Sequence, residues 1–141
     1  MPELKKSDRY SHQMHSYPAK LLANIPYYFL ATDAFCPING IVLDPFCGTG
    51  TVLLEAVLSG RSALGADANP LAELITTVKT NYIAKETLHE TLGQVMKQAK
   101  SYRKIIEYPN AVAVWYSMTS LRQLTNLQRA INKVEDERQR A

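Results

Sequence analysis

The sequence predicts an α/β fold with a parallel sheet, and three observations carry this prediction. Two short apolar runs, at residues 41–43 and 63–66, are each followed directly by an aspartate. Each run leads through a short turn into a segment with apolar residues at helical spacing. A strand, helix, strand, helix order at this spacing forms a βαβα unit, whose strands are parallel and whose crossovers are right-handed.

The composition is that of an ordinary globular chain of 141 residues, with 46% hydrophobic and 21% charged residues. The length fits one domain at most. The formal net charge of +3 permits a nucleic-acid partner but does not argue for one. The first residues lack a secretory signal, and no apolar run reaches the roughly 18–20 residues that a membrane span needs. We therefore expect a cytoplasmic protein with no membrane partner and with Cys36 and Cys47 reduced.

The segment before the first strand is predicted to contain a polar arm and a helix. Residues 1–16 are polar and are expected to form an extended arm or loop. Pro18 suits the first turn of a helix, and apolar residues then recur at helical spacing between positions 21 and 29. Pro26 interrupts this pattern, which predicts a kink or a break there.

The βαβα core is predicted over the next segments. The wholly apolar run 41–43 is typical of a strand that is buried on both faces. A helix is expected over 51–59, with Gly60 placed to end it. The second strand covers 63–66, and Pro70 begins a helix that runs to about Ala84.

The remaining residues predict a helical extension. One helix is expected over 86–106, and the basic residues from 97 to 104 are interpreted as its solvated face, although they could touch DNA phosphates. Residues 111–116 are expected to form a short strand or a buried loop, with Trp115 and Tyr116 in the core. A leucine stripe predicts a helix over 119–134. The predicted organisation is a polar arm (1–16), a core with a preceding lid helix (17–84) and a helical extension (85–141).

The strongest chemical signal is the turn at 44–51, Asp-Pro-Phe-Cys-Gly-Thr-Gly-Thr, between a predicted strand and a predicted helix. Gly48 and Gly50 let the backbone turn tightly and approach a ligand closely. The helix that follows directs its free N–H groups at the turn. Asp67, at the end of the next strand, stands where a carboxylate accepts the hydroxyls of a ribose. Together they predict a nucleotide-like cofactor at the carboxyl ends of the strands.

Other kinds of site fit less well. A nicotinamide dinucleotide is disfavoured because its third glycine is replaced by Leu53, and a P-loop would need Gly-Lys-Ser/Thr after the turn. His12 and His15 have no cysteine or carboxylate at ligand spacing, so no metal is predicted. Cys47 has no placed general base and is interpreted as a packing residue. A tight turn that binds no ligand stays open as an alternative.

Residues 42–51 (VLDPFCGTGT) resemble the S-adenosylmethionine-binding motif of the DNA amino-methyltransferases, and residues 65–72 (GADANPLA) are similar to the acidic motif that follows it. Residues 15–20 (HSYPAK) resemble the H-x-Y-P-A-K segment of one branch of N4-cytosine and N6-adenine methyltransferases. Trp115-Tyr116 with the following helix is similar to a segment that those enzymes insert before their catalytic strand. The resemblance covers roughly residues 11–134 and implies a partial Rossmann-like methyltransferase domain with parallel strands and additional C-terminal helices.

The resemblance also implies S-adenosylmethionine as the cofactor. The residues around the glycine turn would hold its methionine and ribose portions, and Asp67 would bind the ribose hydroxyls. The HSYPAK segment would form a lid, with Lys20 near the cofactor carboxylate. The cofactor-binding residues predicted in this way are Tyr17, Pro18, Lys20, Asp44, Pro45, Phe46, Gly48, Gly50, Asp67 and Asn69.

The catalytic motif of that family, Ser/Asp/Asn-Pro-Pro followed by an aromatic residue, has no counterpart, since the chain contains no Pro-Pro dipeptide. No catalytic residue is therefore assigned. We expect the cofactor-binding N-terminal part of a restriction–modification type DNA methyltransferase, inactive by itself. It would act on an exocyclic amine of cytosine or adenine through the complete enzyme. The chain would be either the N-terminal fragment of that enzyme or one half of a split enzyme, whose second polypeptide carries the catalytic half. An RNA guanine-N2 methyltransferase fragment and a non-catalytic binding subunit or remnant remain as alternatives.

Overall fold

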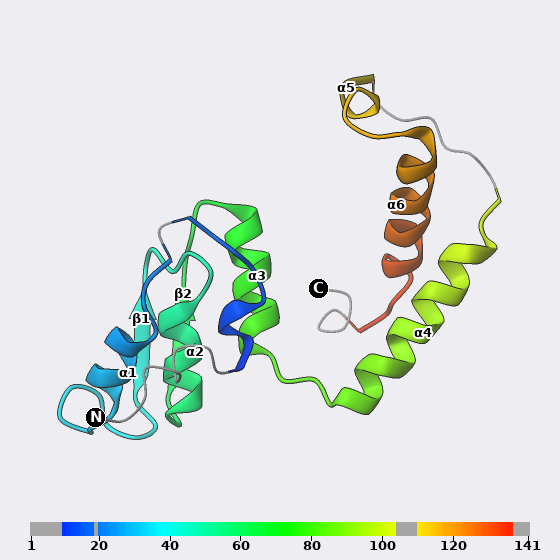
Figure 1. Ribbon diagram of the computed structural model, residues 1–141. Helices are drawn as coiled ribbons and strands as arrows, with labels where there is room; N and C mark the ends of the chain where they lie inside the picture. Colours follow the sequence, from blue (N-terminus) through cyan, green and yellow to red (C-terminus); the bar gives the residue numbers. More distant parts are fainter. Residues whose placement is uncertain (1–9, 19, 104–109, 137–141) are drawn as a thin grey trace. The chain divides into compact units, whose positions relative to one another are not determined.

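The computed structural model describes residues 10–18, 20–103 and 110–136, which form two compact units that meet in sequence between Tyr82 and Ile83 (Figure 1). The first unit contains the sheet. Its elements are η2 (Tyr10–Gln13), a 3-10 helix, α1 (Asn24–Leu30), β1 (Ile41–Asp44), α2 (Thr51–Leu58), β2 (Ser62–Gly65) and α3 (Pro70–Thr80).

The two strands lie side by side and are parallel, with Ile41 opposite Ser62 and Asp44 opposite Gly65. The connecting helix α2 packs against both strands (Figure 1). The predicted α/β class with parallel strands is therefore confirmed. Because the register aligns the last residues of the strands, the turns that follow β1 and β2 leave the same edge of the sheet.

Helix α2 forms the centre of the first unit. Leu53, Leu54 and Ala56 are buried, together with Ala72 and Ile75 of α3. A glycine in β2 allows the close approach of α2, because a Cβ added at Gly65 would lie 2.6 Å from Cδ2 of Leu53. Leu53 stands where a dinucleotide fingerprint has its third glycine, so here the strand and not the helix carries the small residue.

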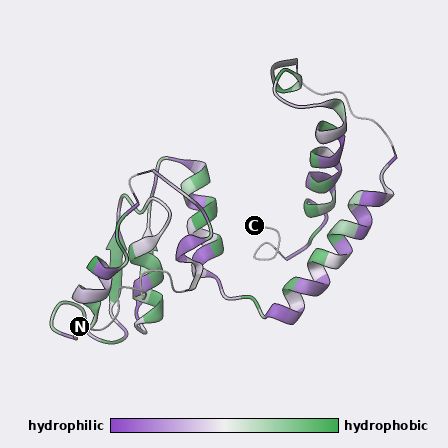
Figure 2. Ribbon diagram, in the orientation of Figure 1, coloured by the Kyte–Doolittle hydropathy of each residue, from purple (hydrophilic) through white to green (hydrophobic). Residues whose placement is uncertain are grey.

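One face of the sheet is left open by the described helices. Ile41 and Leu43 are 66% and 68% exposed, and Leu64 beside Leu43 is 59% exposed. Figure 2 shows both strands in hydrophobic colours. The prediction that the first strand is buried on both faces is therefore wrong for the described chain, because α2 covers the opposite face only.

The N-terminal segment differs from the prediction in two respects. Residues 10–13 form a helical turn with a buried His12, so this part of the chain is not an extended arm; residues 1–9 lie outside the described residues. The next helix, α1, begins at Asn24, whereas Pro18 lies in a turn. Pro26 then falls in the first turn of α1, where a missing N–H costs nothing, so it does not break the helix.

The predicted helix after Asp67 ends at Thr80 and not at Ala84, since Asn81 is already extended. Its start is as expected: Pro70 is the first helical residue, and the Asn69 side chain accepts a hydrogen bond from Leu71 N–H. The strand over 63–66 is confirmed one residue earlier, as Ser62–Gly65, and the helix over 51–59 is confirmed as Thr51–Leu58.

The described part of the second unit consists of α4 (Lys85–Ser101), α5 (Asn110–Ala113) and α6 (Met118–Ile131). Helices α4 and α6 pack together and bury Val95, Leu121 and Ala130. The two predicted helices are present, but both end earlier than expected. Helix α4 ends at Ser101 and not at 106, since Tyr102 is already extended, and α6 ends at Ile131 and not at 134; residues 104–106 lie outside the described residues. The expectation of a strand or buried loop at 111–116 is wrong, because a helical turn begins at Asn110 and Trp115 is 81% exposed.

None of the described helices has both the length and the apolar character that crossing a membrane would require.

Two of the glycines in left-handed conformations allow a matched test of the turn. Gly50 (φ 69°) lies against Thr76, and a Cβ added there would approach the Thr76 side chain to 2.7 Å. Gly60 (φ 78°) would meet nothing within 4 Å. We expect Gly60→Ala to lower the free energy of unfolding by about 1–2 kcal/mol through backbone strain. Gly50→Ala should cost about 3 kcal/mol or more, because overpacking is added to the strain.

Chemical denaturation of the two variants beside the wild type measures this difference. Equal destabilisation by both substitutions would contradict the close packing of the turn against α3.

Candidate functional site

The turn after β1 is joined to the residues after β2 by backbone hydrogen bonds. Ala66 N–H donates to the Asp44 carbonyl (3.1 Å), and Cys47 N–H donates to the Ala66 carbonyl (3.0 Å). The Asp44 carboxylate accepts from Phe46 N–H at 3.1 Å, which closes the first bend of the turn. The two predicted cofactor motifs therefore continue as paired chains beyond the ends of the strands.

Asp67 makes the central side-chain contact of the site. Its Oδ2 accepts from Gly48 N–H and its Oδ1 from Asn69 N–H, both at 2.9 Å. The acidic residue thus holds the glycine turn and begins its own turn at the same time. An ionised carboxylate offers about four acceptor positions, so each oxygen keeps capacity for a further donor.

The glycine turn is supported by α3. The Thr76 hydroxyl donates to the Gly48 carbonyl at 2.9 Å, and Lys79 Nζ donates to the Thr49 carbonyl at 2.5 Å. Gly48 has a φ of 50°, and a Cβ added to it would meet nothing within 4 Å. The space beside Gly48 is therefore open at the position of its missing Cβ, where a ligand can reach the backbone.

Contacts among the described residues attach the segment before α1 to the core. Ser11 Oγ donates to the Lys79 carbonyl (3.1 Å), and His12 Nε2 lies 2.8 Å from Glu55 Oε1 in α2. Further along, the Asn69 amide donates to the Tyr17 hydroxyl at 2.9 Å. The last of these contacts joins Tyr17 of the HSYPAK segment to Asn69 of the GADANPLA segment.

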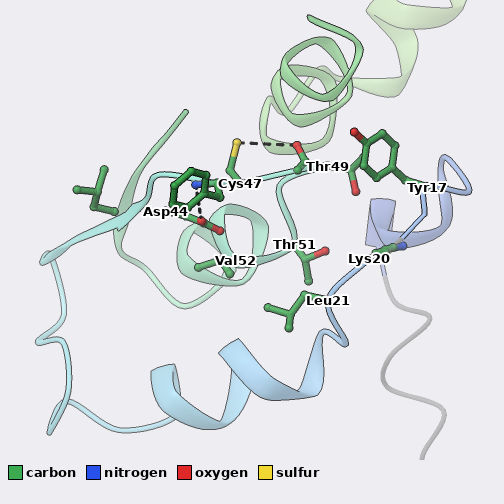
Figure 3. A pocket seen from close by; sticks show the side chains of 11 residues that line it. Tyr17, Lys20, Leu21, Asp44, Cys47, Thr49, Thr51 and Val52 are labelled. Carbon is green, nitrogen blue, oxygen red and sulfur yellow. Dashed lines mark hydrogen bonds between the residues drawn. The ribbon is translucent and has the colours of Figure 1, made fainter. Parts of the chain in front are cut away.

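A cavity of about 430 Å³ lies between this segment and the glycine turn. Figure 3 shows Tyr17 and Lys20 on the segment before α1, Asp44 at the end of β1, and Cys47 and Thr49 on the turn that follows. The described residues that line the cavity are Tyr17, Lys20, Leu21, Leu43, Asp44, Phe46, Cys47, Gly48, Thr49, Thr51 and Val52.

Five of the ten predicted cofactor residues line this cavity: Tyr17, Lys20, Asp44, Phe46 and Gly48. Asp67 lines a second cavity, also of about 430 Å³, which shares Cys47 with the first. Asn69 is linked to the first cavity through its bond to Tyr17. The other three residues, Pro18, Pro45 and Gly50, are not among the described residues that line either cavity.

Burial changes the acid–base properties of three groups near the turn. The Lys79 side chain is buried, and this burial, with a smaller contribution from the charge of Lys20, lowers the pKa of Lys79 to about 8. Burial also lowers the pKa of His12 below 6.5, against the opposing effect of Glu55. The pKa of the Cys47 thiol is raised by burial, which disfavours the thiolate and agrees with a packing role.

Three supporting residues were not predicted from the sequence: His12, Thr76 and Lys79. A signal for two of them exists, since Ala72, Ile75, Thr76 and Lys79 form the buried stripe of α3 at i, i+3, i+4 and i+7. A lysine and a threonine on such a stripe indicate buried polar partners. For His12 no local pattern gives the signal, because its partner Glu55 is 43 positions away.

A family model described as DNA methylase matches residues 2–78, which is more than half of the chain. The chain belongs to this family of N6 and N4 DNA amino-methyltransferases. The resemblance indicated by the VLDPFCGTGT and GADANPLA motifs is thereby confirmed.

Two similar proteins are each named as a type II methyltransferase. The type II methyltransferase M.MjaII of Methanocaldococcus jannaschii is 28% identical over 100 residues, which cover 71% of this chain and 18% of that protein. The type II methyltransferase M.MvaI of Kocuria varians is 30% identical over 86 residues, covering 60% of this chain and 19% of that protein. The alignments thus span less than a fifth of each relative's length. No solved structure matches the chain.

The buried pair of His12 and Glu55 predicts a pH dependence of stability. Because the pKa of His12 is lowered in the folded protein, the unfolded chain binds the proton more readily. The contribution of His12 is complete above pH 6.5, and it is lost as the pH falls toward the lowered pKa. His12→Gln removes this titration, and its amide can still donate to Glu55.

Urea denaturation between pH 7.5 and 5 measures the effect. We expect the wild type to lose more unfolding free energy than His12→Gln over this interval. Parallel pH profiles would contradict the burial of an uncharged His12.

Proposed function

We propose that this chain binds S-adenosylmethionine at the carboxyl edge of β1 and β2. It would form the cofactor-binding part of a site-specific DNA methyltransferase that modifies N4 of cytosine or N6 of adenine. The observation that carries the proposal is the 2.9 Å hydrogen bond from Gly48 N–H to Asp67, which joins the two cofactor motifs at one edge of the sheet.

The cavity beside Gly48 fits a cofactor of this size. Its volume of about 430 Å³ lies within the roughly 300–1,000 Å³ of small-molecule sites. Gly48 lets the ligand contact the backbone, and Tyr17 and Asp44 supply polar groups on two sides. Lys20 donates one hydrogen bond to the His12 carbonyl, and its ammonium group has two further donors for the cofactor carboxylate.

The other residues have supporting roles in this proposal. Asp67 would bind the ribose hydroxyls with its remaining acceptor positions while it holds Gly48. Pro18, Pro45 and Gly50 would shape the lid and the turn, and Asn69 would position Tyr17. When bound, S-adenosylmethionine supplies an electrophilic methyl group, for which the nucleophile is the exocyclic amine of a base extruded from the duplex.

We also propose that the first unit is a partial Rossmann-like methyltransferase domain. The parallel pair of strands joined through α2 supports this assignment. The proposed domains are the polar arm (1–16), the core (17–84) and the helical extension (85–141), and the division of the structure between Tyr82 and Ile83 lies close to the last boundary.

Methyl transfer by such an enzyme would also need residues that are not among these 141. The chain has no Pro-Pro dipeptide, so in this proposal it lacks the catalytic motif that the resemblance implies. The open apolar face of the sheet, formed by Ile41, Leu43 and Leu64, supports a further polypeptide that packs there. The same observations favour, as the second candidate, a binding subunit that takes up the cofactor without catalysis.

Cofactor binding is tested by a pair of matched substitutions. Gly48 and Gly60 both have a left-handed backbone, and a Cβ added to either meets nothing within 4 Å. Of these two glycines, only Gly48 lines the cavity that also contains Tyr17 and Lys20. Gly48→Ala should weaken the binding of S-adenosylmethionine by roughly tenfold or more, because the alanine methyl group would occupy space that the ligand needs. Gly60→Ala should bind like the wild type.

Isothermal titration calorimetry on the three proteins provides the measurement. The same affinity for Gly48→Ala and Gly60→Ala would place the cofactor elsewhere, and no heat with the wild type would remove the proposal.

A further inference from the structure

The second unit contains a groove that the cofactor proposal does not use. It lies between α4 and α6 and has a volume of about 1,020 Å³. Apolar side chains of both helices line it, and so do three basic side chains, Lys100, Arg103 and Arg122. The complete set of described lining residues is Met96, Ala99, Lys100, Tyr102, Arg103, Tyr116, Ser120, Arg122, Gln123, Leu124, Asn126 and Leu127.

All the charged side chains among the described lining residues of this groove are basic. The lining set contains three cationic side chains and neither aspartate nor glutamate. Lys100, Arg103 and Arg122 are exposed, and within the described part of the chain no ion pair joins them to a carboxylate. Two other cations of this unit make cation–π contacts instead: Arg129 lies 4.2 Å and Lys133 5.4 Å from the centre of the Tyr102 ring.

We propose that the α4–α6 groove binds the phosphodiester backbone of DNA. Cations without internal partners attract phosphates, and the absence of lining carboxylates removes the repulsion that acidic groups would add. The apolar side chains offer a surface for the C–H faces of deoxyribose. The half-exposed Tyr116 provides an aromatic surface on which a base can stack.

A purely apolar occupant fits the groove less well. Covering Lys100, Arg103 and Arg122 with hydrophobic side chains would remove their hydration without supplying a counter-charge, which is costly. The proposal rests on the proposed function in one respect: a DNA methyltransferase must hold its substrate. It adds a location for part of that contact, on the helical extension and not on the cofactor-binding unit.

Fluorescence anisotropy with a labelled DNA duplex and the full 141-residue chain tests the groove. In Lys100→Gln/Arg122→Gln, two charges of the groove are removed. In the control Lys85→Gln/Lys97→Gln, two exposed charges of α4 outside the groove are removed. A charge-preserving variant, Lys100→Arg/Arg122→Lys, shows whether substitution at these positions harms the fold.

We expect the groove variant to bind DNA about tenfold more weakly. Its slope of log affinity against log salt should be less steep by about two, because two phosphate contacts are lost. The charge-preserving variant and the control should stay near the wild type. Equal losses in the groove variant and the control would overturn the proposal, as would unchanged binding in both. Displacement of the duplex by poly-glutamate as efficiently as by unlabelled DNA would also overturn it.

Calorimetry with S-adenosylmethionine on the same groove variant separates this proposal from the proposed function. Weakened DNA binding with wild-type cofactor affinity supports both. Groove-dependent DNA binding by a chain that binds no cofactor would uphold the groove and overturn the cofactor site. Cofactor binding without groove-dependent DNA binding would do the reverse.

Discussion

The hydrogen bond from Gly48 N–H to the Asp67 carboxylate connects two turns that belong to different strands. It can form because β1 and β2 are parallel and in register, with Asp44 opposite Gly65 at their ends. The backbone bonds of Ala66 to Asp44 and of Cys47 to Ala66 extend the pairing to the point where Asp67 takes over. A shift of the register by one residue would reverse the faces of the strand and separate these partners.

The remaining contacts of the first unit keep this turn in place from the other side. Thr76 and Lys79 bind the Gly48 and Thr49 carbonyls, so α3 carries the turn on a row of buried side chains. The burial of Lys79 has an electrostatic cost, which is expressed in a pKa of about 8. The segment with His12 and Ser11 then packs on α2 and α3 and brings Tyr17 and Lys20 to the cavity. Contacts from α3 therefore hold the turn in place, and contacts with α2 and α3 hold the segment that lines the cavity.

The features of this fold that depend on residues close together in the sequence are the ones that were predicted correctly. Asp44 and Asp67 end apolar runs, Gly60 follows a helix, and Asn69-Pro70 begins the next one. These signals act within a few residues of each other. The burial of His12 was missed because its partner Glu55 is distant in the sequence. The start of α1 was misplaced because Pro26 was interpreted as a break, whereas it lies buried in the first turn of the helix. The open sheet face also escaped prediction, since the apolar run 41–43 reads the same whether or not a second layer covers it.

The central claim, that the Gly48 and Asp67 turns hold S-adenosylmethionine, is tested most directly by NMR on the ¹⁵N-labelled chain. A titration with S-adenosylmethionine should shift the amide signals of Gly48, Gly50 and Asn69 progressively, because the first lies at the cavity and the others are bonded to its frame. The amides of Lys97 and Leu121 in the helical extension should stay in place. Signals of Gly48 and Asn69 that do not move at saturating cofactor, or shifts confined to the helical extension, would contradict it.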